Sequence, residues 1–361
     1  MRLALVSDAW APQVNGVVRT LRTTLGLLEA RGWQVLTITP DRFRSMPCPT
    51  YPEIRLALAT PGRVGGMIED FGADALHIAT EGPLGLAARH HALKVGRPFT
   101  TSFHTRFPDY VAARFRISPD PGWRYLRWFH GAARRVLVAT PSLARELSGH
   151  GLHQTRLWSR GVDLGQFRPG LPLPDAYRNL PRPILLNVGR VAVEKNLEAF
   201  LALDAPGSKV VVGDGPALAA LRARYPDTLF LGALSGEALA QAYAGADLFV
   251  FPSRTDTFGL VLVEAMASGL PVAAFPVAGP LDVVGESDAG VLDEDLASAV
   301  HRALRIPRTA ALAHAQGFTW EAAASQFEAG IMKSLGEAKE ARASLPQNLS
   351  VIPNEKKRPS G

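Results

Sequence analysis

Residues 251–272, Phe251-Pro-Ser-Arg-Thr-Asp-Thr-Phe-Gly-Leu-Val-Leu-Val-Glu-Ala-Met-Ala-Ser-Gly-Leu-Pro-Val272, decide which fold the chain is expected to adopt. The apolar run from 246 to 251 predicts a buried parallel strand. Residues 253–257 predict a polar turn, and residues 258–268 predict a helix closed by a glycine and a proline. This strand, turn and helix start is where an α/β sheet offers free backbone N–H groups to an anion.

Two carboxylates frame the predicted helix. Asp256 precedes it in the turn, and Glu264 follows eight residues later, which is about two turns along one helix face. The arrangement suits a ligand that has hydroxyl groups at two ends and negative charge between them. The alternative is that Asp256 caps the helix and that Glu264 is a solvated helix residue.

The residues around the two acids carry a family resemblance. Phe258, Gly259 and Leu260 lie between the acids, and Ala-Ser-Gly-Leu-Pro-Val follows at 267–272. The stretch resembles the signature of the retaining glycosyltransferases of family 4, although the first acid of that signature is usually Glu, one methylene longer than Asp256. The sequence Thr-Asp-Thr-Phe-Gly is similar to a subgroup of mannosyl- and sulfoquinovosyl-type transferases that act on lipids.

The resemblance covers residues 1–340 and implies a GT-B fold, in which two Rossmann-like, doubly wound parallel-sheet domains face a cleft. A chain of 361 residues also exceeds what a single core usually encloses. The predicted parts are an acceptor-binding domain (1–168), a proline-rich linker (169–183), a nucleotide-sugar domain (184–318), a helix crossing back to the first domain (319–340) and a disordered tail (341–361).

Alternating strands and helices over residues 2–165 predict a doubly wound parallel sheet. The strands are expected at Leu3–Val6, Val35–Thr39, Ala75–Ile78, Pro98–Phe103 and Val136–Ala139. Such sheets bind ligands at the carboxyl ends of their strands. No Gly-x-Gly-x-x-Gly sequence occurs in the chain, which argues against a nicotinamide enzyme.

Three residues of the first domain are candidates because they follow predicted strands. Gly16 precedes a helix, where its missing Cβ allows a phosphate to approach the backbone. The alternative is that this glycine only forms an ordinary tight turn. The resemblance implies that this loop covers the donor diphosphate, and that His104 lies against the transferred sugar rather than being only structural. Glu81 is a candidate contact for the acceptor.

The second domain contains two cations near one predicted helix N-terminus. Arg190 and Lys195 lie in Gly-Arg-Val-Ala-Val-Glu-Lys-Asn, where their charges and the helix dipole converge. They could be ordinary surface cations, but the sequence resembles the diphosphate clamp of the family. Gly213 and Gly215 form a further glycine turn, which the resemblance places beside the nucleotide.

The resemblance also implies a role for each acid. Glu264 would bind the ribose hydroxyls, and Asp256 would bind hydroxyls of the transferred sugar beside the amides of residues 258–260. Upstream, residues 159–169 resemble the Asn-Gly-Val-Asp motif of the family, but Arg160 occupies the usual Asn position.

The segment from Arg106 to Arg135 is strongly basic. It holds seven arginines and two acids, a net charge of +5 in a chain whose total is +6. Because Trp and Tyr are interleaved with these arginines, an anionic membrane surface is the expected partner, with Arg124, Arg127 and Trp128 as candidate contacts. The alternative places the aromatic residues in the core and the arginines in solvent. Nucleic acid is not expected, since no nucleic-acid-binding motif accompanies the charges.

No metal and no cofactor are expected. The acids of Asp293-Glu-Asp295 resemble a metal motif, but acids also favour a helix N-terminus, so they predict a helix start. The single cysteine, Cys48, fits a reducing compartment. The apolar run at the start of the sequence is too short for a signal peptide. The expected location is the cytoplasm, at the inner face of the cytoplasmic membrane.

The expected activity is therefore a retaining, metal-independent hexosyl transfer, mannose favoured, from a nucleoside diphosphate sugar to a membrane lipid or polyprenyl-linked acceptor. The family is thought to react on one face of the sugar, with the leaving phosphate taking the acceptor's proton, so that no nucleophilic carboxylate is needed. Three alternatives stay open: a UDP-hexose transferase with a soluble acceptor, an epimerase or sugar-phosphate-using synthase, and a non-catalytic nucleotide-sugar binder.

Overall fold

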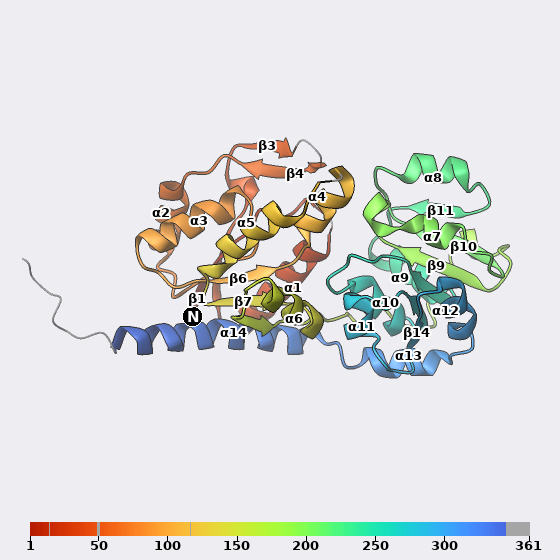
Figure 1. Ribbon diagram of the computed structural model, residues 1–361. Coiled ribbons are helices and arrows are strands. Elements are labelled where there is room, and N and C mark those ends of the chain that lie inside the picture. Colours follow the sequence, from red (N-terminus) through yellow and green to blue (C-terminus); the bar gives the residue numbers. More distant parts are fainter. Residues whose placement is uncertain (14, 49–50, 116, 344–361) are drawn as a thin grey trace, which may run out of the picture.

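A computed structural model describes residues 1–13, 15–48, 51–115 and 117–343. Two α/β domains lie side by side, and a long helix near the end of the chain runs beneath the first of them (Figure 1). Each domain is built on a parallel six-stranded sheet, as the alternation of strands and helices predicted for the first domain and the family resemblance implied for both.

The first sheet has the strand order β2-β1-β5-β6-β7-β8. Its strands are β1 (Arg2–Val6), β2 (Gln34–Ile38), β5 (Ala75–Ile78), β6 (Thr100–Phe103), β7 (Arg135–Val138) and β8 (Thr155–Leu157). The five predicted strands are confirmed to within two residues at each end. The edge strand β8 and the antiparallel hairpin of β3 (Ser45–Cys48) and β4 (Tyr51–Ala57) were not predicted.

Strand β1 shows why the first sheet is buried on both faces. Leu3 and Leu5 pack into a core with α1, whereas Ala4 and Val6 pack on the opposite face against α2 and α3, as the two-residue period of a strand requires. The helices of this domain are α1 (Gly16–Ala30), α2 (Pro61–Phe71), α3 (Pro83–Lys94), α4 (Phe107–Phe115), α5 (Asp120–Gly131) and α6 (Pro141–Gly149).

The second sheet has the order β11-β10-β9-β12-β13-β14, and it is also flanked by helices on two sides. Its strands are β9 (Ile184–Val188), β10 (Ser208–Val212), β11 (Leu229–Gly232), β12 (Leu248–Phe251), β13 (Val272–Ala274) and β14 (Gly290–Leu292). Its helices are α7 (Leu197–Leu201), α8 (Leu218–Arg224), α9 (Gly236–Ala244), α10 (Leu260–Ala267), α11 (Ala278–Val283), α12 (Leu296–Ala303) and α13 (Arg308–Ala315).

The proline-rich segment between the sheets is packed onto the second domain. It contains a 3₁₀ turn at Asp175–Tyr177. Tyr177 is buried in the core of the second domain, and its hydroxyl donates to the carbonyl of Ala242 at 3.2 Å. The segment between 169 and 183 is therefore anchored to one of the two domains that it joins.

Helix α14 (Trp320–Ala343) returns to the first domain, as predicted. Trp320 and Phe327 join the core that contains Leu3 and Leu5. The carboxylate of Glu328 accepts hydrogen bonds from Arg31 at 2.8 Å and from the indole of Trp33 at 3.1 Å. The predicted disordered tail lies outside the described residues from 344 onwards, and its first three residues belong to α14.

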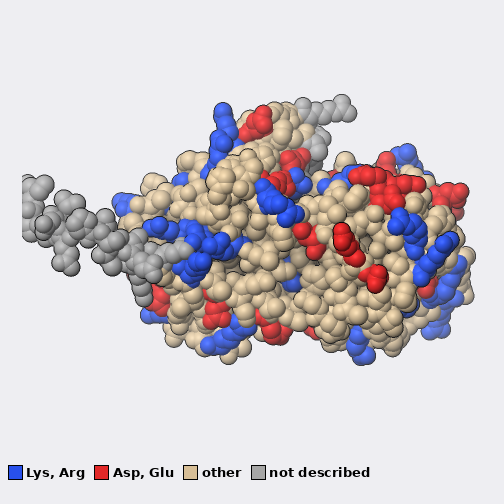
Figure 2. Space-filling view, turned by 60° about the horizontal axis from the view of Figure 1, so that its bottom comes forward, with Lys and Arg blue, Asp and Glu red and all other residues tan. Residues whose placement is uncertain are grey.

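The surface seen in Figure 2, which brings the underside of Figure 1 forward, carries groups of both charge signs with neutral surface between them. In the described part of the chain, no helix combines the length and the apolar character needed to cross a bilayer.

Candidate active site

The strand, turn and helix predicted around Asp256 are present as β12, a turn and α10. Helix α10 starts after Gly259, whose φ of 83° is a left-handed conformation that favours glycine. Among the described residues, Asp256 Oδ1 pairs with Lys195 and Oδ2 has no partner, so the alternative that Asp256 caps this helix is wrong. The alternative for Glu264 is also wrong, because that residue is 4% exposed.

Asp256 is paired with the predicted clamp lysine. The Nζ atom of Lys195 lies 2.5 Å from Oδ1 of Asp256. Two further bonds hold the same pair of loops together, from Asn196 to the carbonyl of Pro252 at 3.1 Å and from Thr255 to that of Glu194 at 3.2 Å. The sequence placed these two residues in separate roles, whereas the structure brings them into direct contact.

The second oxygen of Asp256 is an open acceptor. Oδ2 is buried and has no hydrogen-bond partner within the described part of the chain. A buried carboxylate oxygen without a partner is costly, and a ligand hydroxyl would satisfy it. Asp256 therefore offers an unused hydrogen-bond acceptor beside the ammonium group of Lys195.

Arg190 follows β9 in a loop whose backbone packs tightly against a glycine turn. The amide of Val191 donates to the carbonyl of Asp214 at 2.9 Å. A Cβ atom on Gly213 would lie 1.8 Å from the carbonyl oxygen of Gly189, and one on Gly215 would lie 2.4 Å from that of Val191. Only glycine fits at both positions, because the two backbone loops touch.

Glu264 is held by both domains. Arg19 of α1, in the first domain, forms an ion pair with Oε1, and the hydroxyl of Tyr243 in α9 donates to Oε2 at 2.9 Å. Burial raises the pKa of the Glu264 carboxyl, while Arg19 and then Tyr243 act against that rise. Arg19 and Tyr243 were not predicted, and the one sequence signal for Arg19 is its place about one turn after Gly16.

The loop at Gly16 starts α1 and meets the second domain. The side chain of Asn15 accepts hydrogen bonds from the amides of Val17 and Val18, both at 3.0 Å. A Cβ atom on Gly16 would lie 3.3 Å from the side chain of Leu260. Asn15 thus uses two of the first-turn amides, and the predicted contact of this loop with a diphosphate stays a prediction.

His104 lies at the boundary of the domains, where its main chain and both ring nitrogens are engaged. Its carbonyl accepts from the hydroxyl of Thr257 at 3.0 Å, across the interface. Arg160 donates to Nδ1 at 3.3 Å, so the proton of the neutral ring is on Nε2, which is 2.8 Å from Ser102 Oγ. Burial, followed by the nearby Arg160 charge, holds the pKa of His104 well below its usual value.

Arg160, which replaces the usual Asn of the family motif, is buried beside His104. Its guanidinium donates to the carbonyls of Trp158 at 2.5 Å and Ser159 at 3.0 Å, and it lies over the Trp158 ring. Burial lowers the pKa of Arg160 to about 9, so the group is still a cation at neutral pH. If His104 lies against the transferred sugar, as predicted, the guanidinium of Arg160 adds a positive charge next to that position.

Glu81 belongs to a separate hydrogen-bond network in the first domain. Its Oε1 lies 3.0 Å from Nε2 of the buried His130, whose Nδ1 is 2.9 Å from Thr101 Oγ1. The nearby Asp8 caps α3 by accepting from the amide of Leu84 at 2.9 Å, and burial raises its pKa. Neither His130 nor Asp8 was predicted, and the predicted acceptor contact of Glu81 stays a prediction.

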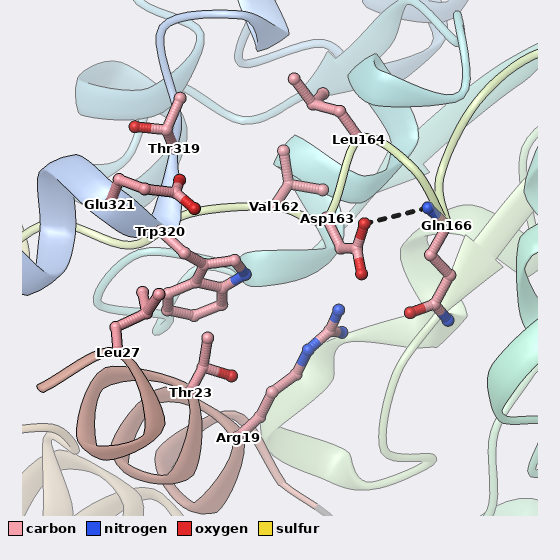
Figure 3. Close-up of a pocket in the computed structure, with 10 residues that line it drawn as sticks. All are labelled: Arg19, Thr23, Leu27, Val162, Asp163, Leu164, Gln166, Thr319, Trp320 and Glu321. Carbon is pink, nitrogen blue, oxygen red and sulfur yellow. Dashed lines mark hydrogen bonds between the residues drawn. The ribbon is translucent and has the colours of Figure 1, made fainter. Parts of the chain in front are cut away.

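A pocket of about 520 Å³ lies where the chain passes twice between the domains, with Arg19 and Asp163 facing each other across it (Figure 3). It is lined by Arg19, Thr23, Leu27, Val162, Asp163, Leu164, Gln166, Thr319, Trp320 and Glu321. Arg19 therefore contacts Glu264 while its side chain also borders this open space.

The basic segment, residues 106–135, has some aromatic residues in the core and others on the surface, so it agrees in part with both the core interpretation and the membrane interpretation. Trp123 and Phe129 are buried in the core. On the outer face of α5, Arg124, Arg127 and Trp128 are exposed, with 53% of Trp128 accessible. The candidate membrane residues thus share one helix face.

The acids of residues 293–295 begin a helix, as predicted. The side chain of Asp295 accepts from the amide of Ala297 at 3.0 Å and caps α12. Asp293 forms an ion pair with Arg302 at 3.0 Å. Within the described ranges, no cluster of three or more His, Cys, Asp or Glu side chains is arranged to hold a metal ion.

Two family models match the chain. A model described as Glycosyltransferase Family 4 matches residues 14–166, and one described as Glycosyl transferases group 1 matches residues 182–306. Together they cover the part of the chain that contains both sheets.

Curated relatives extend this similarity. A GDP-mannose-dependent alpha-mannosyltransferase of Mycolicibacterium smegmatis is 33% identical, over 81% of this chain and 84% of the relative. A sulfoquinovosyl transferase of Arabidopsis thaliana is 32% identical, over 77% and 60%. An alpha-monoglucosyldiacylglycerol synthase of Streptococcus pneumoniae is 27% identical, over 84% and 78%.

Among solved structures, a sucrose-phosphate synthase from Thermosynechococcus elongatus superimposes with a TM-score of 0.74. It is 25% identical in sequence, and the match covers 94% of this chain and 99% of the other. The similarity thus includes the arrangement of both domains.

Proposed function

Because the chain belongs to the family 4 glycosyltransferases and has their two-domain GT-B fold, we propose that it transfers a hexose with retention of configuration. Mannose is the favoured hexose and a nucleoside diphosphate sugar the donor. The acceptor is a membrane lipid or a lipid-linked glycan. The observation that carries the proposal is the buried Oδ2 of Asp256, which lies beside Lys195 and has no hydrogen-bond partner among the described residues.

The donor lies against the second domain. Arg190 and Lys195 hold the diphosphate, Glu264 binds the ribose hydroxyls, and Asp256 Oδ2 accepts a hydroxyl of the sugar. The amides of residues 258–260 lie alongside, with Gly213 and Gly215 next to the nucleoside and Gly16 over the diphosphate. His104 faces the sugar from the first domain, next to Arg160. The hydrogen bond from the Thr257 hydroxyl to the His104 carbonyl supports this placement of His104, because Thr257 belongs to the same turn as Asp256.

The reaction breaks the bond between the anomeric carbon and the diphosphate oxygen, whose electron pair stays on the diphosphate. The acceptor hydroxyl bonds to the same face of the sugar and gives its proton to the departing phosphate. Fixed cations stabilise the charge that develops on this leaving group. Arg190 and Lys195 supply that charge, so the proposal includes neither a metal nor a protein nucleophile.

The acceptor reaches the first domain from an anionic membrane surface at the cytoplasmic side. The exposed Arg124, Arg127 and Trp128 of α5 support this orientation, because cations and an indole ring suit the headgroup region. The diacylglycerol glycolipid named in the Streptococcus pneumoniae relative supports a lipid acceptor, with Glu81 as its candidate contact.

A donor panel tests the proposal. Purified protein is incubated with radiolabelled GDP-mannose, UDP-glucose and UDP-galactose, each with a membrane lipid extract and with soluble sugar acceptors. The expected product is an α-linked mannolipid, with its anomeric configuration read by NMR. Transfer from a UDP-hexose to a soluble acceptor would contradict the donor and acceptor assignments, and donor binding without transfer or hydrolysis would identify a non-catalytic binder.

A further inference from the structure

Glu264 takes its counter-ion from the opposite domain. Its carboxylate is 4% exposed and lies on α10 of the second domain. The guanidinium that pairs with it belongs to Arg19 on α1, 245 residues earlier in the chain. Tyr243 of α9 donates to the other oxygen at 2.9 Å.

These two contacts leave hydrogen-bond acceptor capacity unused on the same carboxylate. An ionised carboxylate has about four lone-pair sites, and Arg19 and Tyr243 use two of them. The remaining sites can accept the two hydroxyls of a ribose. A protonated carboxyl would keep fewer acceptor sites and would lose the stronger hydrogen bonds that a charged acceptor makes.

We propose that Arg19 is a positioning residue that keeps Glu264 ready to bind the donor ribose, so that the first domain completes the nucleotide site of the second. The inference rests on the ribose role assigned to Glu264 under the proposed function. Arg19 does not need to touch the donor, because it acts through the carboxylate with which it pairs.

The environment of Glu264 makes its ionisation depend on this partner. Burial raises the pKa of Glu264, Arg19 is the largest influence that lowers it, and the Tyr243 hydroxyl follows. Tyr243 is itself kept neutral, because burial and then the adjacent carboxylate raise its pKa. Tyr177 is a more distant influence, through Tyr243, and Asp163 faces Arg19 across the pocket (Figure 3).

The same contact links donor affinity to domain position. A movement that separates α1 from α10 would remove the counter-ion of Glu264 while leaving it buried. The second domain alone therefore binds the donor ribose more weakly than the closed pair of domains does.

The experiment measures donor affinity against pH. Isothermal titration with GDP-mannose is performed between pH 5.5 and 8.5 on the whole chain and on Arg19→Gln and Arg19→Lys. The diphosphate of a sugar nucleotide is a diester whose charge is constant over this range. Arg19→Gln is expected to weaken binding about tenfold or more at pH 6 and much less at pH 8.5, since the pKa of Glu264 rises. Arg19→Lys keeps the positive charge, so its donor affinity should change as little with pH as that of the original chain.

Two controls separate the possible causes. Arg22→Gln removes an equally charged but exposed residue of α1 and should leave both affinity and pH profile unchanged. A 2′,3′-dideoxy analogue of GDP-mannose lacks the ribose hydroxyls, so its affinity should differ little between the original chain and Arg19→Gln.

The outcomes also distinguish this inference from the proposed function. If Glu264→Gln weakens GDP-mannose binding while Arg19→Gln keeps the original pH profile, the positioning role of Arg19 is wrong and the ribose role of Glu264 survives. If Glu264→Gln binds GDP-mannose normally, the ribose assignment itself is wrong. If the dideoxy analogue is weakened as much as GDP-mannose by Arg19→Gln, Arg19 acts directly on the diphosphate instead.

Discussion

At the scale of single residues, the contact between Lys195 and Asp256 makes their charges interdependent. Replacing Asp256 by Asn removes the negative charge that faces the lysine, so Lys195 stays available to the diphosphate. We expect donor binding to change by less than about threefold. Turnover should fall about a hundredfold, since a charged contact to the sugar is worth about 3 kcal/mol in the transition state.

Steady-state rates and donor affinities of Asp256→Asn measure this split. Asp256→Glu is the matched control, because it keeps the charge and restores the residue that is usual in the family. It should retain more activity than Asp256→Asn. Normal transfer by Asp256→Asn would show that the residue has no role in the reaction.

Under the proposed mechanism, the cations Arg190 and Lys195 act on the leaving group. Replacing Arg190 or Lys195 by Ala should lower turnover about a hundredfold, or about 3 kcal/mol. Arg254, an exposed arginine bonded to Glu294, provides a control whose replacement by Ala should have little effect. Rates are measured with and without a chelator. A loss caused by chelator would instead assign a role to a bound metal ion.

His77 makes the stability of the first domain depend on pH. Burial lowers its pKa to about 3, whereas an unfolded histidine has a pKa of about 6.5. Between these values the unfolded chain binds more protons, so stability falls as the pH is lowered through this window. From pH 6.5 to pH 5, His77 alone should reduce the unfolding free energy by about 2 kcal/mol.

Urea unfolding followed by tryptophan fluorescence at pH 7.5, 6.5, 5.5 and 5.0 measures the effect. The chain with His77→Gln should show a shallower dependence even if it is less stable at every pH. An identical slope in both chains would assign the acid sensitivity to other groups, of which His104, whose pKa is also lowered, is one.

The sequence indicated individual candidate residues but not their partners in the structure. Asp256, Glu264 and Lys195 became candidates because they lie in short motifs next to buried strands. The pairing of Glu264 with Arg19 spans 245 residues, and nothing local to either residue indicates it. The same is true of the contact between Glu81 and His130.

At the scale of elements, helix α5 separates its aromatic residues between core and surface. Arg124, Arg127 and Trp128 share its exposed face, so reversing two charges tests membrane contact without disturbing the core. Arg124→Glu/Arg127→Glu should reduce co-sedimentation with phosphatidylglycerol vesicles several-fold at 0.15 M salt. Binding of the original chain should also weaken with added salt, because charges are screened over about 8 Å already at this ionic strength.

The control for this helix carries the same change in charge on the second domain. Arg224→Glu/Arg305→Glu alters two exposed residues of that domain and should leave vesicle binding unchanged. Equal sedimentation with phosphatidylglycerol and phosphatidylcholine vesicles would show that the arginines of α5 are solvated and have no membrane role. A soluble acceptor would then be favoured over a membrane lipid.

Elements were predicted well where apolar runs are long and buried on both sides. Strands β1 and β5 lie in such runs, which have few alternatives to a central parallel strand. Strand β2 was also predicted, although it lies at a sheet edge and only its last residue, Ile38, is buried. Strand β8 has only three residues and lies at the sheet edge, and two of its residues are exposed. It therefore lacks the apolar pattern by which the other strands were found.

At the scale of the whole molecule, length and the alternation of strands and helices were enough to predict two domains. Their mutual contacts were not predictable, because each joins residues that lie far apart in the sequence. Ser142 at the start of α6 bonds to Asp282 of α11 at 3.0 Å, and His104 bonds to Thr257. These contacts depend on how the finished domains meet.

Helix α14 has a consequence for synthesis on the ribosome. The first domain is discontinuous in sequence, since its core includes Phe327 of α14, whose ring centre lies 4.8 Å from that of Trp158 and 4.9 Å from that of His77. A nascent chain that has emerged as far as residue 318 has every strand of both sheets but an open face on the first. The second domain can thus finish folding first, while the first domain, although made earlier, waits for helix α14 to leave the exit tunnel.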